Sequence, residues 1–368
     1  MTRVLQILSS LKEGGGVQTM LKNYYSHMEL SALQTDFVVC GEQTGGLEEW
    51  FRRTGSEIYH IPPRARNPVG NLTALNDIIK NGQYDVVHCH QDYHGAAAIA
   101  MAKQYGVKKR IIHSHQAFPP ENGLQRLRRQ SSVPSLLRNA TVFAACGRLA
   151  GEWLYGREMV ESGQVLVLHN AISPQPYTFS QENRERLRGE LGLNPDDLVL
   201  GHIGRFSRSK NHALAVSIFA EFYRSHKNAV LLLAGDGELR PDVEKQAKAL
   251  GLEFRVHFLG VRQDVPELLS AMDLFLMPSR WEGLGIVLIE AQANGLPAVC
   301  SSSVPREVKL ADNIFFADDA SYDNTAAWCR LLETALAAGR GDYRASVERG
   351  GYDICREAKK LEELYLES

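Results

Sequence analysis

Residues 279–301 read SRWEGLGIVLIEAQANGLPAVCS, and this pattern predicts a loop, a helix, a turn and a strand. The apolar run that ends at Met277 predicts a buried strand before the loop. Gly283 and Gly285 allow the backbone to turn tightly and to approach a ligand closely. A helical apolar run begins at Ile286 and is stopped by the turn at 295–297. Residues 298–300 then predict the next strand.

Two carboxylates flank the start of this helix. Glu282 lies in the loop before it, and Glu290 lies about one turn inside an otherwise apolar segment. Free N–H groups and the positive end of the dipole make a helix N-terminus an anion site. The pattern therefore fits a ligand that carries both phosphate and hydroxyl groups. In the alternative interpretation, Glu282 only complements the helix dipole and Glu290 is a solvated helix residue.

The stretch resembles the signature of the family-4 retaining glycosyltransferases, which have the GT-B fold. Their mark is two glutamates separated by seven residues. The matching positions here are, in order, Pro278, Ser279, Glu282, Gly283, Gly285, Glu290, Ala291, Ala293, Gly295 and Pro297. The resemblance implies an α/β fold of two Rossmann-like domains whose parallel sheets face each other across a cleft. It also implies that Glu290 holds the ribose hydroxyls, that Glu282 holds a hydroxyl of the donor sugar, and that the amides of Leu284, Gly285 and Ile286 contact the diphosphate.

The composition fits a two-domain protein of a reducing compartment. A chain of 368 residues that is 44% hydrophobic can form two cores. The net charge of −2 excludes a strong global attraction to nucleic acid. Residues 1–175 nevertheless hold 18 basic and 14 acidic side chains, so the positive excess lies in the first half. The six scattered cysteines form no Cys-x-x-Cys pair, and no signal peptide or membrane span is visible.

Short apolar strands alternate with helical stretches in both halves, which predicts parallel sheets covered on both faces. We expect an N-terminal acceptor-binding domain at 1–172 and a C-terminal domain that binds the nucleotide sugar at 173–350. Residues 351–368 predict a final helix that crosses back to the first domain, as GT-B chains do. Two prolines near residue 175 stiffen the predicted connector.

A glycine-rich loop follows the first predicted strand, at residues 14–16, and a helix follows the loop. Strand, glycine loop and helix form the phosphate-binding opening of a Rossmann-like unit. The dinucleotide fingerprint Gly-x-Gly-x-x-Gly is absent, which disfavours a dehydrogenase. By resemblance, Gly15 and Gly16 lie beside the donor diphosphate; a merely flexible loop is the alternative.

Two histidine pairs sit at predicted strand ends, His88 with His90 and His113 with His115. Histidines are good metal ligands, but hydrogen-bonded histidines that close the strand ends are the commoner arrangement. The family resemblance assigns the sugar-facing role to His115, with His113 as the competing assignment. His113 and Gln116 are also candidates on the acceptor side.

A second basic pair lies after the first strand of the C-terminal half. Arg205 can bind a diphosphate as a planar fork and Lys210 as a point charge, and the family has the same pattern. By resemblance, the backbone near Val261 borders the nucleotide base. The chain has no Asp-x-Asp, so we expect neither a metal nor another cofactor.

Residues 116–140 predict an irregular, basic segment, in which Arg126, Arg128, Arg129 and Arg138 are interspersed with leucines. The segment is either a solvated surface or a surface that meets anionic lipid or an anionic acceptor. We expect a cytoplasmic protein, with peripheral contact with the inner membrane face as an open possibility.

The expected activity is transfer of a hexosyl or N-acetylhexosaminyl group, with retention, from a nucleotide-diphosphate donor to a saccharide or lipid-linked saccharide. UDP is the commonest donor nucleotide in the resembling family, and surface polysaccharide synthesis is a common setting. His115, Glu282, Arg205 and Lys210 are the expected catalytic residues. A sugar-nucleotide epimerase of the same fold and a non-catalytic subunit that binds a nucleotide sugar are the alternatives.

Overall fold

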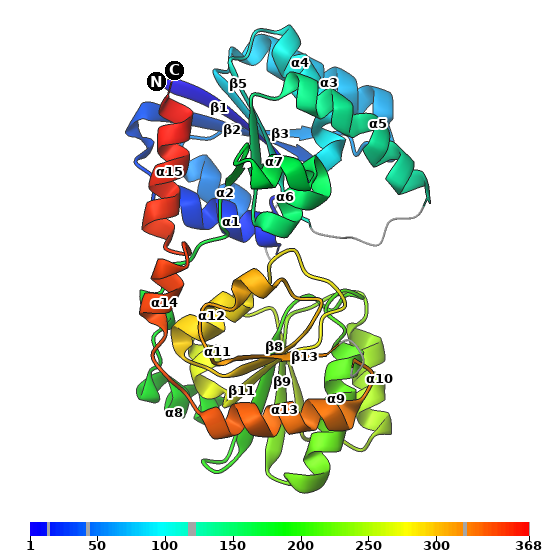
Figure 1. Ribbon diagram of the computed structural model, residues 1–368, viewed down its shortest axis with the longest axis vertical. Coiled ribbons are helices and arrows are strands. Elements are labelled where there is room, and N and C mark those ends of the chain that lie inside the picture. The colour runs from blue at the N-terminus through cyan, green and yellow to red at the C-terminus, as the bar shows by residue number, and fades with distance from the viewer. Residues whose placement is uncertain (13–14, 42–44, 117–122, 319–321, 368) are drawn as a thin grey trace. The chain divides into compact units, whose positions relative to one another are not determined.

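The computed structural model describes residues 1–12, 15–41, 45–116, 123–318 and 322–367. The chain divides into two compact units (Figure 1). Unit 1 comprises Met1–Ala171 and Ile354–Ser368, and unit 2 comprises Ile172–Asp353. The final helix therefore belongs to unit 1, although unit 2 separates it from the rest of that unit in the sequence.

Unit 1 is built on a seven-stranded parallel sheet with strand order β3-β2-β1-β4-β5-β6-β7. Its strands are β1 (Thr2–Ile7), β2 (Leu33–Cys40), β3 (Ile58–Ile61), β4 (Val86–Cys89), β5 (Lys109–Ser114), β6 (Val142–Ala145) and β7 (Val165–Val167). Its helices are α1 (Gly16–Tyr25), α2 (Gly46–Arg53), α3 (Pro68–Gly82), α4 (Ala96–Gln104), α5 (Gly123–Asn139), α6 (Arg148–Tyr155), α7 (Arg157–Glu161) and α15 (Ile354–Leu366).

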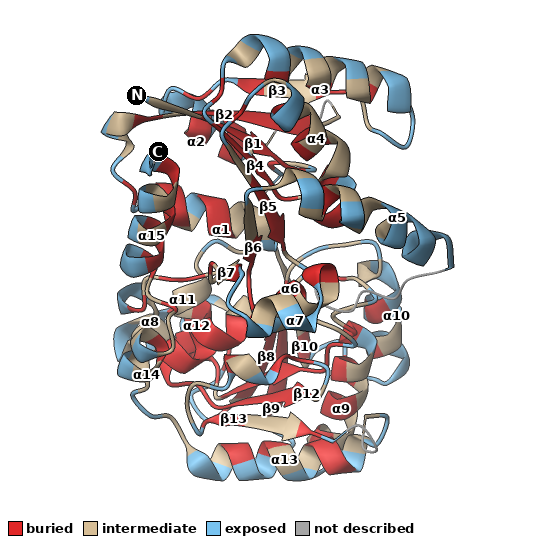
Figure 2. Ribbon diagram, turned by 45° about the horizontal axis from the view of Figure 1, so that its top comes forward, coloured by how far each residue is buried: buried red, intermediate tan, exposed pale blue. Residues whose placement is uncertain are grey.

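The sheet of unit 1 has a hydrophobic core on each face because successive strand residues point to opposite sides. On one face, Val4 and Phe37 pack with residues of α1, α2 and α15. On the other face, Leu5 and Val38 pack with residues of α3, α4 and α6. Figure 2 shows these strands as buried and the outer helix faces as exposed. Near-continuous apolar strands are expected of a parallel sheet that is covered on both sides.

Unit 2 repeats the plan with a six-stranded parallel sheet, in the order β10-β9-β8-β11-β12-β13. Its strands are β8 (Leu198–Ile203), β9 (Ala229–Ala234), β10 (Val256–Gly260), β11 (Leu274–Met277), β12 (Ala298–Ser301) and β13 (Ile314–Ala317). Its helices are α8 (Gln181–Glu190), α9 (His212–Ser225), α10 (Arg240–Ala249), α11 (Val265–Ala271), α12 (Ile286–Asn294), α13 (Thr325–Ala338) and α14 (Arg344–Arg349). The prediction of an α/β fold with two parallel sheets is confirmed.

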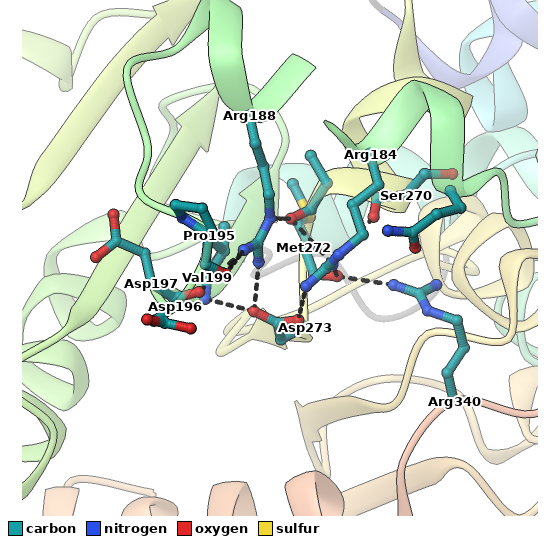
Figure 3. A network of polar contacts seen from close by, with 12 residues as sticks. Arg184, Arg188, Pro195, Asp196, Asp197, Val199, Ser270, Met272, Asp273 and Arg340 are labelled. Carbon is teal, nitrogen blue, oxygen red and sulfur yellow. Dashed lines mark hydrogen bonds and ion pairs between the residues drawn. The ribbon is translucent and has the colours of Figure 1, made fainter. Parts of the chain in front are cut away.

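The start of β11 is anchored by an arginine network (Figure 3). Arg184 and Arg188 of α8 each donate to one carboxylate oxygen of Asp273, at 2.6 and 2.7 Å. Arg184 and Arg340 also donate to the carbonyl of Met272, at the C-terminal end of α11. Cations at the end of a helix are stabilised by its free carbonyl groups. The network fixes the strand that leads into the loop at 278–285.

One segment differs from the sequence prediction. Residues 116–140 were expected to be irregular, but Gly123–Asn139 form the helix α5. The expectation was wrong because the many arginines and serines weaken the apolar periodicity, while arginine, leucine and glutamine are good helix formers. Most of the early residues of α5 are exposed, as Figure 2 shows. Within the described ranges, no helix is both long and apolar enough to cross a lipid bilayer.

Candidate functional site

Each sheet has one point where the strand order reverses. In unit 1 this point lies between β1 and β4, and in unit 2 it lies between β8 and β11. Ligands of open α/β sheets bind outside the carboxyl ends of the strands at such a point. The loops that follow these four strands carry most of the site residues predicted from the sequence.

In unit 2, the loops after β8 and β11 bring a lysine and a glutamate together. Lys210 Nζ lies 2.7 Å from Glu282 Oε1, and the Glu282 side chain is 9% exposed. Ser279 Oγ donates to the same carboxylate oxygen at 2.7 Å. Ser279 itself is fixed through its carbonyl, which accepts from Ser301 Oγ of β12. The carboxylate is therefore held in one position by a cation and a hydroxyl group.

Two further contacts hold these loops side by side. The amide of Arg280 donates to the carbonyl of Ser209 at 2.7 Å. Tyr322 Oη accepts from Asn211 Nδ2 and donates to the carbonyl of Pro278, each at 2.9 Å. Asn211 has a φ of 54°, which asparagine tolerates better than most residues. The positions of Lys210 and Glu282 are thus fixed by backbone as well as side-chain contacts.

Arg205 lies in the same loop as Lys210 but in a different environment. Its side chain is 69% exposed, and its Nη2 lies 3.2 Å from Glu238 Oε2. An exposed ion pair of this kind contributes little to stability. The arginine can leave this pair at small cost and contact a ligand. Val261, which follows β10, is exposed.

The second signature glutamate is buried inside α12. Glu290 is 8% exposed, and Tyr177 Oη donates to its Oε1 at 2.9 Å. Burial raises the pKa of Glu290 to about 7, against the lowering effects of the Tyr177 hydrogen bond and of the Lys210 charge. The sequence alternative of a solvated helix residue is wrong, because every residue of α12 after Ile286 is buried. A carboxyl group at this depth favours ligand hydroxyls that donate to it.

The loop before α12 needs a glycine at its last position. Gly285 caps the helix with φ 88° and ψ 53°, a left-handed conformation that residues with a Cβ rarely adopt. Leu284 is buried, whereas Gly283 and Ile286 are partly exposed. The first amides of an α-helix have no acceptor within the helix, so the start of α12 can donate to an anion.

In unit 1, the glycine loop leads directly into α1. Gly15 is the N-cap, with extended backbone angles, and Gly16 is the first helical residue. A Cβ on Gly15 would lie 2.0 Å from Gln18 Oε1, and Gln18 is tied to the carbonyl of Ser10. Gly14 lies outside the described residues. The structure thus places Gly15 and Gly16 after β1, at the reversal point of this sheet.

The four histidines of unit 1 form one cluster. His90 Nδ1 lies 2.8 Å from His115 Nε2, and His88 Nε2 lies 3.2 Å from His113 Nδ1. The rings of His113 and His115 are stacked, with centroids 4.0 Å apart. Burial lowers the pKa of His88 and of His115 to about 3 and holds the pKa of the other two well below the ordinary value. All four imidazoles are therefore neutral at physiological pH.

The two histidine pairs extend to residues that the sequence patterns did not reveal. His90 Nε2 lies 2.8 Å from Gln6 Oε1, and His88 Nδ1 lies 2.6 Å from Tyr365 Oη. Gln6 lies on β1 and Tyr365 on α15, so no sequence spacing connects them. A polar residue in the apolar run of β1 is the only signal that could have pointed to Gln6. Gln116, the other candidate here, is exposed.

Ring nitrogens of three of these histidines lie within 4.8 Å of one another, as in a metal-ligand set: His88, His90 and His113. The hydrogen bonds above already engage both nitrogens of His88 and both nitrogens of His90. A metal ion bound by His88 and His90 would have to displace one of these hydrogen bonds at each ring. The residues present therefore fit a hydrogen-bonded cluster better than a metal centre.

Comparison with known proteins agrees with this architecture. The family model "Glycosyltransferase Family 4" matches residues 14–175, and "Glycosyl transferases group 1" matches residues 183–332. The chain is 31% identical over 370 residues to EpsF of Bacillus subtilis (strain 168), a protein named as a putative glycosyltransferase; the match covers 99% of this chain and 96% of EpsF.

A second relative is the UDP-Gal:alpha-D-GlcNAc-diphosphoundecaprenol alpha-1,3-galactosyltransferase of Escherichia coli. It is 26% identical over 286 residues, which is 73% of this chain and 72% of that protein. Among solved structures, Anabaena Alr3699/HepE in complex with UDP and glucose has a TM-score of 0.79 at 20% identity, over 99% of both chains. WaaG, a glycosyltransferase involved in lipopolysaccharide biosynthesis, has a TM-score of 0.72 at 16% identity, over 99% of this chain and all of that one. From the signature of α12, the two parallel sheets and these matches together, the chain belongs to the family-4 glycosyltransferases of GT-B fold.

Proposed function

We propose that this glycosyltransferase moves a hexosyl or N-acetylhexosaminyl group from a UDP-sugar to a saccharide or lipid-linked saccharide, with retention at the anomeric carbon, in surface polysaccharide synthesis. The observation that carries the proposal is the pairing of Lys210 with Glu282 at the reversal point of the unit 2 sheet. Support for UDP comes from the UDP complex of HepE, and support for a lipid-linked acceptor comes from the named substrate of the E. coli relative.

The basic residues of unit 2 stabilise the leaving diphosphate. Lys210 supplies a positioned point charge, and Arg205 supplies a planar guanidinium from an exposed position. Free amides at the start of α12 add fixed dipoles. Charge that develops on a leaving group is stabilised most by donors that are already oriented before the reaction.

The two signature glutamates bind hydroxyl groups. Glu290 accepts from the ribose, and Glu282 accepts from a hydroxyl of the donor sugar. The fixed position of Glu282 between Lys210 and Ser279 supports a role in orienting the sugar. The base lies beside the backbone near Val261.

Unit 1 contributes the glycine loop and the histidine cluster. His115 faces the transferred sugar, Gly15 and Gly16 leave room for the backbone to approach the donor, and Gln116 lies on the acceptor side. His113, stacked on His115, lies between the transferred sugar and the acceptor side. The neutral state of the histidines suits hydrogen bonding to sugar hydroxyls rather than binding of phosphate.

The reaction needs no metal ion in this proposal. Arg205, Lys210 and the α12 amides offer positive potential where a divalent cation would otherwise neutralise the diphosphate. The described part of the chain offers one group of three metal-ligand side chains, and both ring nitrogens of two of them, His88 and His90, are already hydrogen-bonded.

The exposed first turns of α5 contact an anionic membrane surface, and the protein works at the inner face of the membrane. Leu124 and Leu127 are 57% and 62% exposed, beside the exposed Arg126 and Arg128. Arg129 is less available, because it lies over the ring of Trp153 and donates to that residue's carbonyl. Exposed leucines among arginines suit an interface where apolar side chains enter and cations meet headgroups.

The test is a transfer assay with a panel of UDP-sugars and GlcNAc-diphosphoundecaprenol as the first acceptor. Product formation, with the donor's anomeric configuration retained by NMR, supports the proposal, and an inverted product contradicts retention. Donor-alone incubation separates the alternatives: epimerisation without acceptor indicates an epimerase. Binding of a nucleotide sugar without product formation on any acceptor that is tested indicates a non-catalytic subunit.

A further inference from the structure

Gln6 sits at the junction of the two histidine pairs. Its Nε2 lies 2.9 Å from Tyr25 Oη and 2.7 Å from Tyr365 Oη, and its Oε1 lies 2.8 Å from His90 Nε2. The side chain is fully buried. The hydrogen bonds that Gln6 makes within the cluster therefore depend on the orientation of its side-chain amide.

This orientation determines the first histidine pair. Because Gln6 Oε1 can only accept, the hydrogen on His90 is on Nε2. His90 Nδ1 then accepts, so His115 must donate from its Nε2. Nδ1 of His115 is left as an unprotonated acceptor.

The same amide determines the second pair through Tyr365. Its hydroxyl accepts from Gln6 and has one hydrogen to donate, which goes to His88 Nδ1. His88 then donates from Nε2 to His113 Nδ1, and His113 has its hydrogen on Nε2.

Turning the amide over gives a second fully paired arrangement, in which all donors and acceptors reverse and every histidine is protonated on Nδ1. Within either histidine pair, a mixed arrangement leaves two donors or two acceptors facing each other in a buried site, which is costly. The second pair follows the first only while Tyr365 donates to His88, since the phenol oxygen can accept twice and its hydrogen can instead point to Tyr25. The arrangement with all four hydrogens on Nε2 matches the orientation of the Gln6 amide in the structure, and it is also the more stable tautomer of a free histidine side chain.

The ring nitrogens at the outer ends of the two hydrogen-bonded histidine pairs are complementary. His115 Nδ1 and His113 Nε2 are buried and have no hydrogen-bond partner among the described residues. One is an acceptor and the other a donor, on stacked rings. A hydroxyl group both donates and accepts, so the pair is suited to one ligand hydroxyl.

We infer that Gln6 and Tyr365 are positioning residues that lock the four histidines into a single tautomer, so that His115 presents an acceptor and His113 a donor to one hydroxyl of the bound sugar. The assignment of the four tautomers does not depend on the proposed function, whereas the contact with the sugar rests on it. Both act indirectly on the sugar: Gln6 acts through both histidine pairs, and Tyr365 acts through His88 and His113.

The test is long-range ¹⁵N–¹H NMR of protein labelled with ¹⁵N-histidine, in which protonated and unprotonated ring nitrogens have distinct shifts. Single histidine variants assign the signals. We expect all four side chains to be neutral and protonated on Nε2. A mixed set of tautomers, an imidazolium at pH 7, or protonation of all four on Nδ1 would overturn the assignment.

Two matched variants isolate the lock. Tyr365→Phe removes the donor to His88 and is expected to give His113 both tautomers, while His115 keeps one. Tyr25→Phe removes a buried hydroxyl that contacts Gln6 but no histidine, and all four tautomers are expected to persist because Gln6 keeps its bonds to Tyr365 and His90. Identical spectra for the two variants would contradict the proposal. Gln6→Met, where it folds, is expected to release both pairs.

Ligand binding gives a second measurement. Tyr365→Phe is expected to weaken binding of the nucleotide sugar about 2- to 10-fold relative to Tyr25→Phe, with binding of UDP alone unchanged, as for loss of one neutral hydrogen bond. Equal affinities of the two variants for the nucleotide sugar would overturn the sugar contact. Failure of wild-type protein to bind any nucleotide sugar would instead refute the proposed function and leave the tautomers measurable. Stoichiometric zinc in the purified protein, with shifted His88 and His113 nitrogens, would overturn the lock.

Discussion

Lys210 Nζ and Glu282 Oε1 lie 2.7 Å apart, so the cation assigned to the diphosphate is paired with the carboxylate assigned to the donor sugar. The pair holds each side chain in place before a ligand arrives. A bound diphosphate would draw on the lysine's remaining donors, since an ammonium group has three. The two residues are therefore expected to act as a unit rather than additively.

Removing either basic residue of the β8 loop should slow turnover. Lys210→Ala and Arg205→Ala are each expected to lower kcat at least about 100-fold, the typical effect of losing one preorganised donor. Steady-state kinetics measures this, with circular dichroism to confirm the fold. Arg208→Ala, an exposed arginine of the same loop, is the control and should retain nearly full activity. Near-normal rates for both test variants would refute the site.

The buried carboxyl group of Glu290 should make stability depend on pH. The pKa is raised from 4.5 to about 7, so the folded state binds more protons than the unfolded state between these values. The contribution of Glu290 to stability should fall as pH rises through this window, by on the order of 3 kcal/mol. Denaturant unfolding of the wild type and of Glu290→Gln at pH 5 and pH 8 measures this contribution as the difference between the two proteins, because the buried histidines also change protonation on unfolding in this range.

Nucleotide binding should show the opposite pH dependence. Ribose hydroxyls donate best to an ionised carboxylate, so the affinity for UDP should rise as pH increases through about 7. Calorimetry across this range tests the prediction. A profile for Glu290→Gln that matches the wild type would mean that Glu290 does not bind the ribose.

Activity should survive chelation of divalent metals. Arg205 and Lys210 take the electrostatic role of a cation, so excess EDTA is expected to leave the rate within about twofold. The assay compares EDTA-treated enzyme before and after Mg²⁺ or Mn²⁺ is added in excess of the EDTA. Loss of activity that either ion restores would show that a metal participates.

Binding to anionic vesicles should depend on α5. Each basic residue near an anionic surface contributes roughly 1 kcal/mol, and salt screens the attraction. Changing Arg126, Arg128, Arg129 and Arg138 to glutamine should abolish co-sedimentation with phosphatidylglycerol vesicles. The matched control changes four other arginines of unit 1 to glutamine, Arg52, Arg53, Arg64 and Arg66. Equal loss in both variants would indicate net charge alone as the cause.

The Asp273 network should be important for stability. Arg188 is buried, and Asp273→Ala removes the carboxylate that faces it. Breaking a buried pair from one side typically costs about 3–5 kcal/mol. A denaturation midpoint unchanged from the wild type would show that the carbonyl groups around Arg188 suffice.

The fold was largely predictable because the strands are apolar runs at regular spacing. The first strand of the C-terminal half, which the sequence predicts before Arg205, is one such run and forms β8 at Leu198–Ile203. The short strand β13, Ile314–Ala317, was not predicted, although the preceding Asp312 and Asn313 are residues typical of turns. The helical nature of α5 was also missed, because packing and propensity, not periodicity, decide it.

The site was predictable only where its residues lie in one motif. Glu282 and Glu290 share a helix and its loop, so their spacing reveals them. Tyr177 and Tyr322 approach the site from elements far away in the sequence, and no local pattern predicts such partners. The ion pair between Arg205 and Glu238 also depends on the tertiary structure, so the sequence did not predict it.

Because α15 belongs to unit 1, the order of synthesis differs from the order of the units. A ribosome completes all of unit 2 before it adds the helix that supplies Tyr365 to the sheet of unit 1. Until then, the nascent first unit exposes the apolar surface that Leu361 and Tyr365 later cover, and Gln6 lacks one of its partners. Domains commonly fold in order from the N-terminus during translation. In this chain, the contiguous second unit can complete its folding first. The first unit, whose apolar surface stays uncovered until α15 is made, is the part that a chaperone would bind during translation.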